Sequence, residues 1–168
     1  MLNAAFYANV PGGQNEPFEP LYVEISKSTH RLMLMNGSEI MWDKAVGLGK
    51  EGSTPEGDFI VKERVLDPLG SKPGVYGSAG LGLGSFAIHG TNDPSSIGVD
   101  LSKGCIRMSN EDVRQLYNFV PKGTKVHIAA NSSQGSPESQ TVNLQQLLPN
   151  TLPQLDETPV HTVFHWLG

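Results

Sequence analysis

The stretch IHGTNDPSSIGVDLSKGCIRM, residues 88–108, is the most informative part of this chain for both fold and chemistry. It places His89 at the end of a strand-like run and, sixteen positions later, Cys105 directly after Gly104. Cysteine catalysis depends on a thiolate, and a neighbouring imidazole can generate one by taking the thiol proton. The stretch therefore predicts Cys105 as a nucleophile and His89 as its base, if the strands that carry them are neighbours.

The alternative interpretation is that Cys105 and His89 have only structural roles. Cys105 is the only cysteine in the sequence, so an intrachain disulfide or a multi-cysteine metal site is excluded. A lone cysteine often serves as a small buried hydrophobe, and a lone histidine is more often structural than catalytic. Gly104 favours the reactive interpretation, because backbone N–H groups beside a residue without a side chain can face a developing oxyanion.

The composition excludes several classes of protein. The 12 basic residues form no run, and the formal net charge is -5, so nucleic acid is not an expected partner. No apolar stretch is long enough to span a bilayer, and the first residues lack the basic and apolar regions of an export signal. The abundance of Gly (19) and Pro (12) predicts short strands joined by turns, hence a mostly β fold.

Short runs of strand-forming residues recur along the middle of the chain, and Asn36-Gly37 supplies a hairpin turn between two of them. The predicted strands are residues 21–26, 30–35, 39–47, 59–65, 85–89 and 125–129. Residues 67–84 carry six glycines and are predicted to form a long loop, of the kind that often walls a functional site. The GxGxxA pattern at 82–87 is not interpreted as a dinucleotide-binding motif, because no predicted strand precedes it and no predicted helix follows it.

A short helix is predicted directly after the cysteine segment. Ser109 followed three positions later by Asp112 resembles a capping box. The apolar residues that follow fall at i, i+3, i+4 and i+7, one face of a helix. They are Val113, Leu116, Tyr117 and Val120.

These signals divide the chain into an irregular arm (1–19), one domain (20–130) and a linker and tail (131–168) that could dock on the domain. The tail is expected to be dispensable for chemistry. His161 and His165 are spaced as HxxxH but lack a further ligand, so a zinc site is not expected. Phe164 and Trp166 are interpreted as docking anchors.

The cysteine segment also resembles a known family. HGT followed by S-x-G-C-I-R-M, an upstream TPxG turn at 54–57, and a downstream NxD helix with a GT-V strand are similar to the catalytic domain of L,D-transpeptidases of the YkuD type. The resemblance runs from about Leu21 to Ala129. It implies a mostly β sandwich or open barrel with one short α-helix after the cysteine loop.

The resemblance also implies a two-step acyl transfer in bacterial peptidoglycan. The cysteine attacks the amide between diaminopimelate and D-Ala of a tetrapeptide stem, D-Ala leaves, and the thioester passes to an amine of a second stem as a 3-3 cross-link. Water as acceptor gives L,D-carboxypeptidase activity instead, and a non-catalytic wall or spore protein is a further alternative. The expected partners are donor and acceptor stems and carbapenem inhibitors, with no metal or cofactor, at the cell wall or spore.

Residue roles follow from the resemblance position by position. It implies Cys105 as nucleophile, His89 as base and later acid, and the Gly90 carbonyl as the group that orients the imidazole. Ser102 and Gly104 belong to the signature, with the amides around Gly104 and Cys105 forming the oxyanion hole.

Two cationic residues complete the predicted site. Arg107 is expected either to brace the loop or to hold a substrate carboxylate through bidentate hydrogen bonds. Lys103 stands where many family members have His. If residues 102–107 are extended, Lys103, Cys105 and Arg107 share one face, and Lys103 either favours the thiolate electrostatically or is a solvated surface lysine.

Overall fold

The computed structural model describes residues 20–132 and 162–167, and its larger sheet has five strands in the order β3-β2-β1-β11-β5. Strands β1 and β11 pair in parallel, and the other neighbours pair antiparallel. Gly37, with φ 56°, lies in the tight turn between β2 and β3 that Asn36-Gly37 predicted. The strands are β1 (Tyr22–Ser26), β2 (Arg31–Asn36), β3 (Glu39–Ala45), β5 (Gly57–Ile60) and β11 (Lys125–Ala129).

The second sheet carries the cysteine segment and has four strands in the order β10-β8-β7-β6. Strands β8 and β10 pair in parallel, whereas β7 pairs antiparallel with both β6 and β8. A short parallel pair, β4 (Leu48–Gly49) with β9 (Asp100–Ser102), precedes the cysteine. The strands of the second sheet are β6 (Glu63–Leu66), β7 (Ala79–Gly82), β8 (Ala87–Gly90) and β10 (Ile106–Met108).

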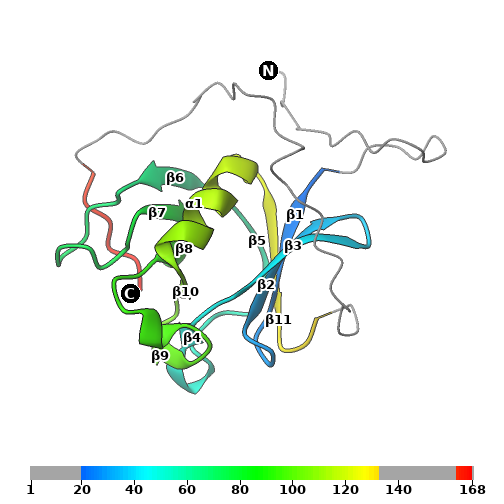
Figure 1. Cartoon of the computed structure of the whole chain (residues 1–168), viewed down its shortest axis with the longest axis horizontal. Helices are drawn as coiled ribbons and strands as arrows, with labels where there is room; N and C mark the ends of the chain where they lie inside the picture. The colour runs from blue at the N-terminus through cyan, green and yellow to red at the C-terminus, as the bar shows by residue number, and fades with distance from the viewer. Residues whose placement is uncertain (1–19, 133–161, 168) are drawn as a thin grey trace.

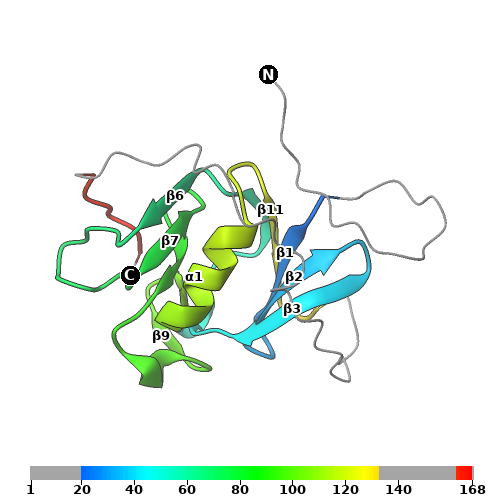
Figure 2. The ribbon, with the colours of Figure 1, turned by 45° about the horizontal axis from the view of Figure 1, so that its top comes forward.

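Helix α1 (Asn110–Phe119) lies between the two sheets in the views of Figures 1 and 2 and contacts β7 and β8. Ser109 caps it by accepting a 3.1 Å hydrogen bond from the Asp112 N–H, as the capping box predicted. Its predicted apolar face is buried in a core shared by both sheets. Two single-turn 3-10 helices, Lys50–Gly52 and Pro94–Ser96, complete the regular structure of the described residues. The predicted mostly β fold with a helix after the cysteine loop is confirmed.

Two sequence predictions differ from the structure. The run 59–65 is not one strand, because the chain leaves the five-stranded sheet after Ile60 and enters the four-stranded sheet at Glu63. Between them, Val61 N–H donates to Thr124 O in one sheet region and Lys62 N–H donates to Gly82 O in the other.

The predicted loop 67–84 contains strand β7, whose sequence is Ala-Gly-Leu-Gly. A Cβ on Gly80 would lie 2.7 Å from the Trp166 ring, and one on Gly82 would lie 2.5 Å from a Glu63 carboxylate oxygen. The Trp166 ring therefore favours glycine at position 80, whereas the flexible Glu63 side chain could move away from a side chain at position 82. Propensity alone argues against a strand with these glycines.

No helix among the described residues is long and apolar enough to cross a membrane. The arm 1–19 and most of the linker and tail lie outside the described residues. The predicted division of the chain into arm, domain and tail stays a prediction.

Candidate active site

Strands β8 and β10 bring the cysteine and histidine segments together. Their parallel register pairs Ile106 with Ile88 and Arg107 with His89. Cys105 immediately precedes β10, and its Sγ accepts a 3.3 Å hydrogen bond from the Ala87 N–H at the start of β8. The strands that carry the histidine and follow the cysteine are therefore direct neighbours.

The imidazole of His89 is buried and oriented by its neighbour. Its Nδ1 lies 2.5 Å from the carbonyl oxygen of Gly90, and because a carbonyl only accepts, Nδ1 carries the proton. Nε2 is buried and has no hydrogen-bond partner within the part of the chain that the structure describes. This tautomer leaves the Nε2 lone pair available to accept a proton.

Burial strongly favours the neutral form of the imidazole. Desolvation lowers the pKa of His89 to about 4, against the opposing effect of the Gly90 hydrogen bond, and the positive charge of Arg107 lowers it further. His89 is therefore a neutral imidazole at pH 7. Tyr76 packs edge-on against its ring at a centroid distance of 5.0 Å.

The Cys105 thiol is likewise buried and protonated in this arrangement. Desolvation raises its pKa to about 12, while the hydrogen bond from Ala87 and the charge of Arg107 act in the opposite direction. A thiol in this state is a poor nucleophile at neutral pH, because the thiolate is the reactive form. The described site is therefore held in a neutral state, without a thiolate–imidazolium pair.

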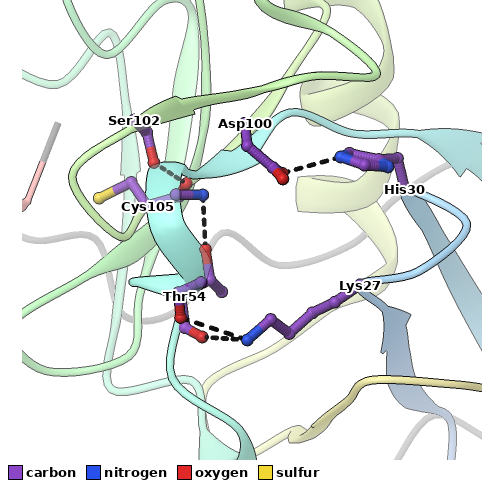
Figure 3. Close-up of polar contacts among 8 residues, drawn as sticks. Lys27, His30, Thr54, Asp100, Ser102 and Cys105 are labelled. Carbon is purple, nitrogen blue, oxygen red and sulfur yellow. Dashed lines mark hydrogen bonds and ion pairs between the residues drawn. The ribbon is translucent and has the colours of Figure 1, made fainter.

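Ser102 shapes the loop that presents the cysteine, as Figure 3 shows. Its hydroxyl donates a 2.6 Å hydrogen bond to the Cys105 carbonyl and accepts a 3.0 Å one from the Gly104 N–H. Gly104 has φ 143°, a conformation that glycine alone adopts readily. The Gly104 amide is thus engaged within the loop, whereas the Cys105 N–H donates outward, over 2.9 Å, to the carbonyl of Leu167.

The turn containing Thr54 is hydrogen-bonded to β4 and to Lys27. Thr54 Oγ1 accepts a 2.8 Å hydrogen bond from the Gly49 N–H, and Lys27 Nζ donates to the Thr54 carbonyl over 2.9 Å (Figure 3). A Cβ on Gly49 would lie 3.0 Å from the Gly104 Cα. Strand β4, which is hydrogen-bonded to the turn, therefore packs its backbone against that of the cysteine loop.

The two predicted cations occupy different environments. Lys103 is exposed, and a bend at Lys103 and Gly104 separates β9 from β10, so residues 102–107 do not form the single extended run on which a shared face depended. Arg107 is half-buried beside His89, and its Nε is buried without a hydrogen-bond partner among the described residues. The roles assigned to both residues stay predictions.

The sequence interpretation did not anticipate that the tail reaches the site. Trp166 and Phe164 are buried and stacked, with ring centroids 4.5 Å apart, and Tyr76 donates a 2.9 Å hydrogen bond to the Trp166 carbonyl. Tyr76 was also missed, although it is the only aromatic residue in the stretch 67–84 that was predicted to wall a site. The F-x-W spacing was a signal for docking but not for its location.

The HxxxH pair is not formed as a helical motif in the described chain. His161 lies outside the described residues, and His165 is exposed in a segment, 162–167, that has no helical turn. Among the described residues, no cluster of three or more His, Cys, Asp or Glu side chains is arranged to hold a metal ion.

Comparisons with known proteins identify the family and agree with the fold. The YkuD model, described as the L,D-transpeptidase catalytic domain, matches residues 20–128. Two putative L,D-transpeptidases YkuD, from Bacillus licheniformis and Bacillus subtilis, are each 37% identical over 122 residues, covering 71% of this chain and 72% of theirs. This chain therefore belongs to the L,D-transpeptidase catalytic-domain family.

Solved structures agree on the fold. The catalytic domain of the E. faecium L,D-transpeptidase aligns with a TM-score of 0.55 and 22% identity, covering 68% of this chain and 100% of that chain. L,D-transpeptidase 3 of Mycobacterium tuberculosis, in complex with a faropenem-derived adduct, aligns with a TM-score of 0.56 and 17% identity, covering 64% and 59%.

Proposed function

We propose that this protein is a peptidoglycan L,D-transpeptidase in which the Cys105 thiolate attacks the diaminopimelate–D-Ala amide of a tetrapeptide stem. The observation that carries the proposal is the pairing of β8 with β10, with the His89 imidazole tied through Nδ1 to the Gly90 carbonyl. This hydrogen bond leaves Nε2 as the basic nitrogen on the strand next to the nucleophile.

In the first half-reaction, His89 Nε2 takes the thiol proton and Cys105 Sγ forms a bond to the carbonyl carbon of diaminopimelate. The tetrahedral intermediate collapses by breaking the C–N bond, and the imidazolium returns its proton to the departing D-Ala amine. A thioester on Cys105 and free D-Ala remain. Each proton and electron pair is accounted for by the thiol, the imidazole and the amide.

In the second half-reaction, the side-chain amine of an acceptor stem attacks the thioester carbon. His89 Nε2 accepts the amine proton, the C–S bond breaks, and the sulfur recovers the proton as a thiol. The new amide is a 3-3 cross-link. If water replaces the amine, the same steps release a tripeptide stem, which is the carboxypeptidase alternative.

The oxyanion of each intermediate needs a fixed donor. Of the two amides predicted for this purpose, the Gly104 N–H is occupied by Ser102 Oγ and the Cys105 N–H points to an acceptor outside the loop. We assign the oxyanion contact to the Cys105 N–H, with Ser102 as a positioning residue that fixes the loop conformation.

Arg107 is suited to bind the terminal carboxylate of the donor stem. Its main chain already exchanges two 2.8 Å hydrogen bonds with Gly47, so the strand does not need the guanidinium for support. Its buried Nε has no partner among the described residues, and a carboxylate from a ligand would satisfy it.

A reactive Cys105 would also be acylated by carbapenems, with opening of the β-lactam C–N bond and no loss of atoms. The faropenem-derived adduct of the mycobacterial relative supports this expectation. The proposed site of action is the cell wall or the spore, where the stem peptides occur.

The test is incubation of the purified chain with a disaccharide tetrapeptide, followed by mass spectrometry of the products. A cross-linked dimer with release of D-Ala supports transpeptidation, and a tripeptide alone supports the carboxypeptidase. The absence of product from both the folded wild-type chain and a folded variant with weakened tail contacts would favour a non-catalytic wall or spore protein. Cys105→Ala is the control for each product.

A further inference from the structure

The C-terminal segment, residues 162–167, lies along the candidate active site and is drawn in red in Figure 1. Val163 forms an isolated parallel bridge with Leu69, and the Phe164 N–H donates a 2.8 Å hydrogen bond to the Leu69 carbonyl. Further on, the Leu167 N–H donates to the Ser85 carbonyl over 3.2 Å. The segment is therefore held by main-chain hydrogen bonds on both sides of Trp166.

Alternate side chains of this segment are buried. Phe164 and Trp166 point inward, whereas His165 and Leu167 are exposed, the period expected of an extended peptide. The Trp166 ring lies nearly parallel to the His89 imidazole, at an interplanar angle of 13° and a centroid distance of 6.5 Å. Gly80 makes room for this ring, because a Cβ there would lie 2.7 Å from it.

Leu167, the last residue of the segment, occupies the backbone N–H that the proposed reaction needs. The Leu167 carbonyl accepts the Cys105 N–H at 2.9 Å, and a scissile carbonyl would need that same donor when Sγ attacks. One N–H cannot serve both acceptors with good geometry. Cys105 and His89 are at the same time fully buried, although both must meet a substrate from solvent.

We propose that residues 162–167 are an intramolecular, substrate-like occupant of the donor site, the surface beside Cys105 and His89 that the segment covers. The Leu167 carbonyl stands in for the scissile carbonyl, and the segment must leave before substrate reaches Cys105. The donor site then takes an extended peptide with alternate aromatic anchors. This inference rests on the proposed function for the identity of the donor.

Release of the segment does not require unfolding of the sheets. Its contact with Leu69 is an isolated bridge outside the named strands, and β11, the last strand of the domain, ends at Ala129. Residues 133–161 connect the domain to the segment. Docking and release are therefore an equilibrium of the tail, which substitutions at its anchors can shift.

The test compares full-length Trp166→Ala with the matched control His165→Ala, which changes the exposed neighbour. The readout is the second-order rate constant for alkylation of Cys105 by iodoacetamide at pH 7. Trp166→Ala is expected to react about tenfold faster or more than wild type, and His165→Ala within about twofold of it. Equal rates for the wild type and Trp166→Ala, or a slower rate for the variant, overturn the inference.

Tyr76→Phe is a second, smaller substitution that keeps the inference testable if Trp166→Ala fails to fold. It keeps the ring and removes only the hydroxyl that donates to the Trp166 carbonyl. A smaller rise in alkylation rate, with a cooperative thermal transition retained, supports the inference. No rise in this variant together with a non-cooperative Trp166→Ala would overturn it.

Addition of a separate peptide tests whether the donor site binds the sequence of the C-terminal segment. TVFHWLG, the sequence of residues 162–168, is expected to slow alkylation of Trp166→Ala, and the same peptide with Ala in place of Trp is not. If alkylation separates the variants but no form releases D-Ala from a tetrapeptide, the proposed function fails and this inference stands. If all forms release D-Ala at the wild-type rate and alkylate alike, this inference fails and the function stands.

Discussion

His89 and Arg107 are direct partners across the parallel strands β8 and β10. The guanidinium next to the imidazole disfavours a second positive charge, and it adds to burial in lowering the pKa of His89. The same charge acts on Cys105 in the opposite sense, because it favours a thiolate. One side chain therefore promotes both the neutral base and the charged nucleophile.

Replacement of His89 by Ala is expected to lower the rate of D-Ala release by about 10²–10⁴-fold, the usual contribution of a general base. The measurement is kcat with a tetrapeptide donor at pH 7. His127→Ala is the matched control, because His127 is a half-exposed histidine on β11 that pairs with Asp58. A His89→Ala rate within about twofold of the control would remove His89 from the mechanism.

Replacement of Arg107 by Gln is expected to lower kcat/KM for a donor ending in D-Ala by about tenfold or more, the loss of one charged hydrogen bond. With a donor ending in D-Ala amide, the loss should be small, since that donor has no carboxylate to bind. Arg107→Lys should recover only part of the activity, because Lys lacks the planar fork. Equal losses on both donors, with a lower melting temperature, would instead indicate that Arg107 braces the fold.

The buried imidazole predicts a loss of stability on the acid side. In the folded chain the pKa of His89 is about 4, below its ordinary value of 6.5, so the unfolded chain binds the proton first as the pH falls. Stability should decline between about pH 6.5 and 4, by up to about 3 kcal/mol from this residue. Urea unfolding as a function of pH measures it, and His89→Gln should show a shallower decline. Parallel curves for the two proteins would contradict the assignment.

Cys105 predicts the corresponding loss on the alkaline side. Its folded pKa is raised from 9 to about 12, so the unfolded thiol ionises first and stability should fall as the pH rises above about 9. Cys105→Ala should lack this component in the same urea experiment. A decline of equal slope in both proteins would assign it to other groups.

Titration of Cys105 with a thiol reagent distinguishes the effects of Arg107 and Lys103 on the pKa of the thiol. Arg107→Gln should raise the apparent pKa of the thiol, because the Arg107 charge favours the thiolate. Lys103 is exposed to solvent, which screens its charge, so Lys103→Gln should give a curve close to wild type. A clear upward shift in Lys103→Gln would restore the electrostatic role that an extended strand predicted.

The sequence predicted those parts of the fold whose signals are local. The strands 21–26 and 125–129, the turn at Asn36-Gly37 and the helix capped by Ser109 all follow from alternation, turn chemistry or capping, and the structure contains them. Strand β7 was missed because its glycines Gly80 and Gly82 lie close to side chains that are distant in the sequence. Propensity carries no information about such neighbours.

The site shows the same division. A histidine and a cysteine brought together by neighbouring strands could be predicted from the segment 88–108, since motif and resemblance both lie within it. The contacts of Trp166 with His89 and of Leu167 with Cys105 join positions that are far apart in the sequence and carry no shared motif. Only tertiary structure could reveal that the tail covers the nucleophile.

The most direct test of the central claim is intact-mass analysis of the protein during turnover of a disaccharide tetrapeptide. We expect a transient adduct equal to the donor minus D-Ala, carried by Cys105 and accompanied by one equivalent of free D-Ala, with neither signal in Cys105→Ala. Because tail occupancy limits access, the measurement is made on Trp166→Ala as well as on wild type. Release of D-Ala by Cys105→Ala at the wild-type rate would contradict the claim that this thiol is the nucleophile.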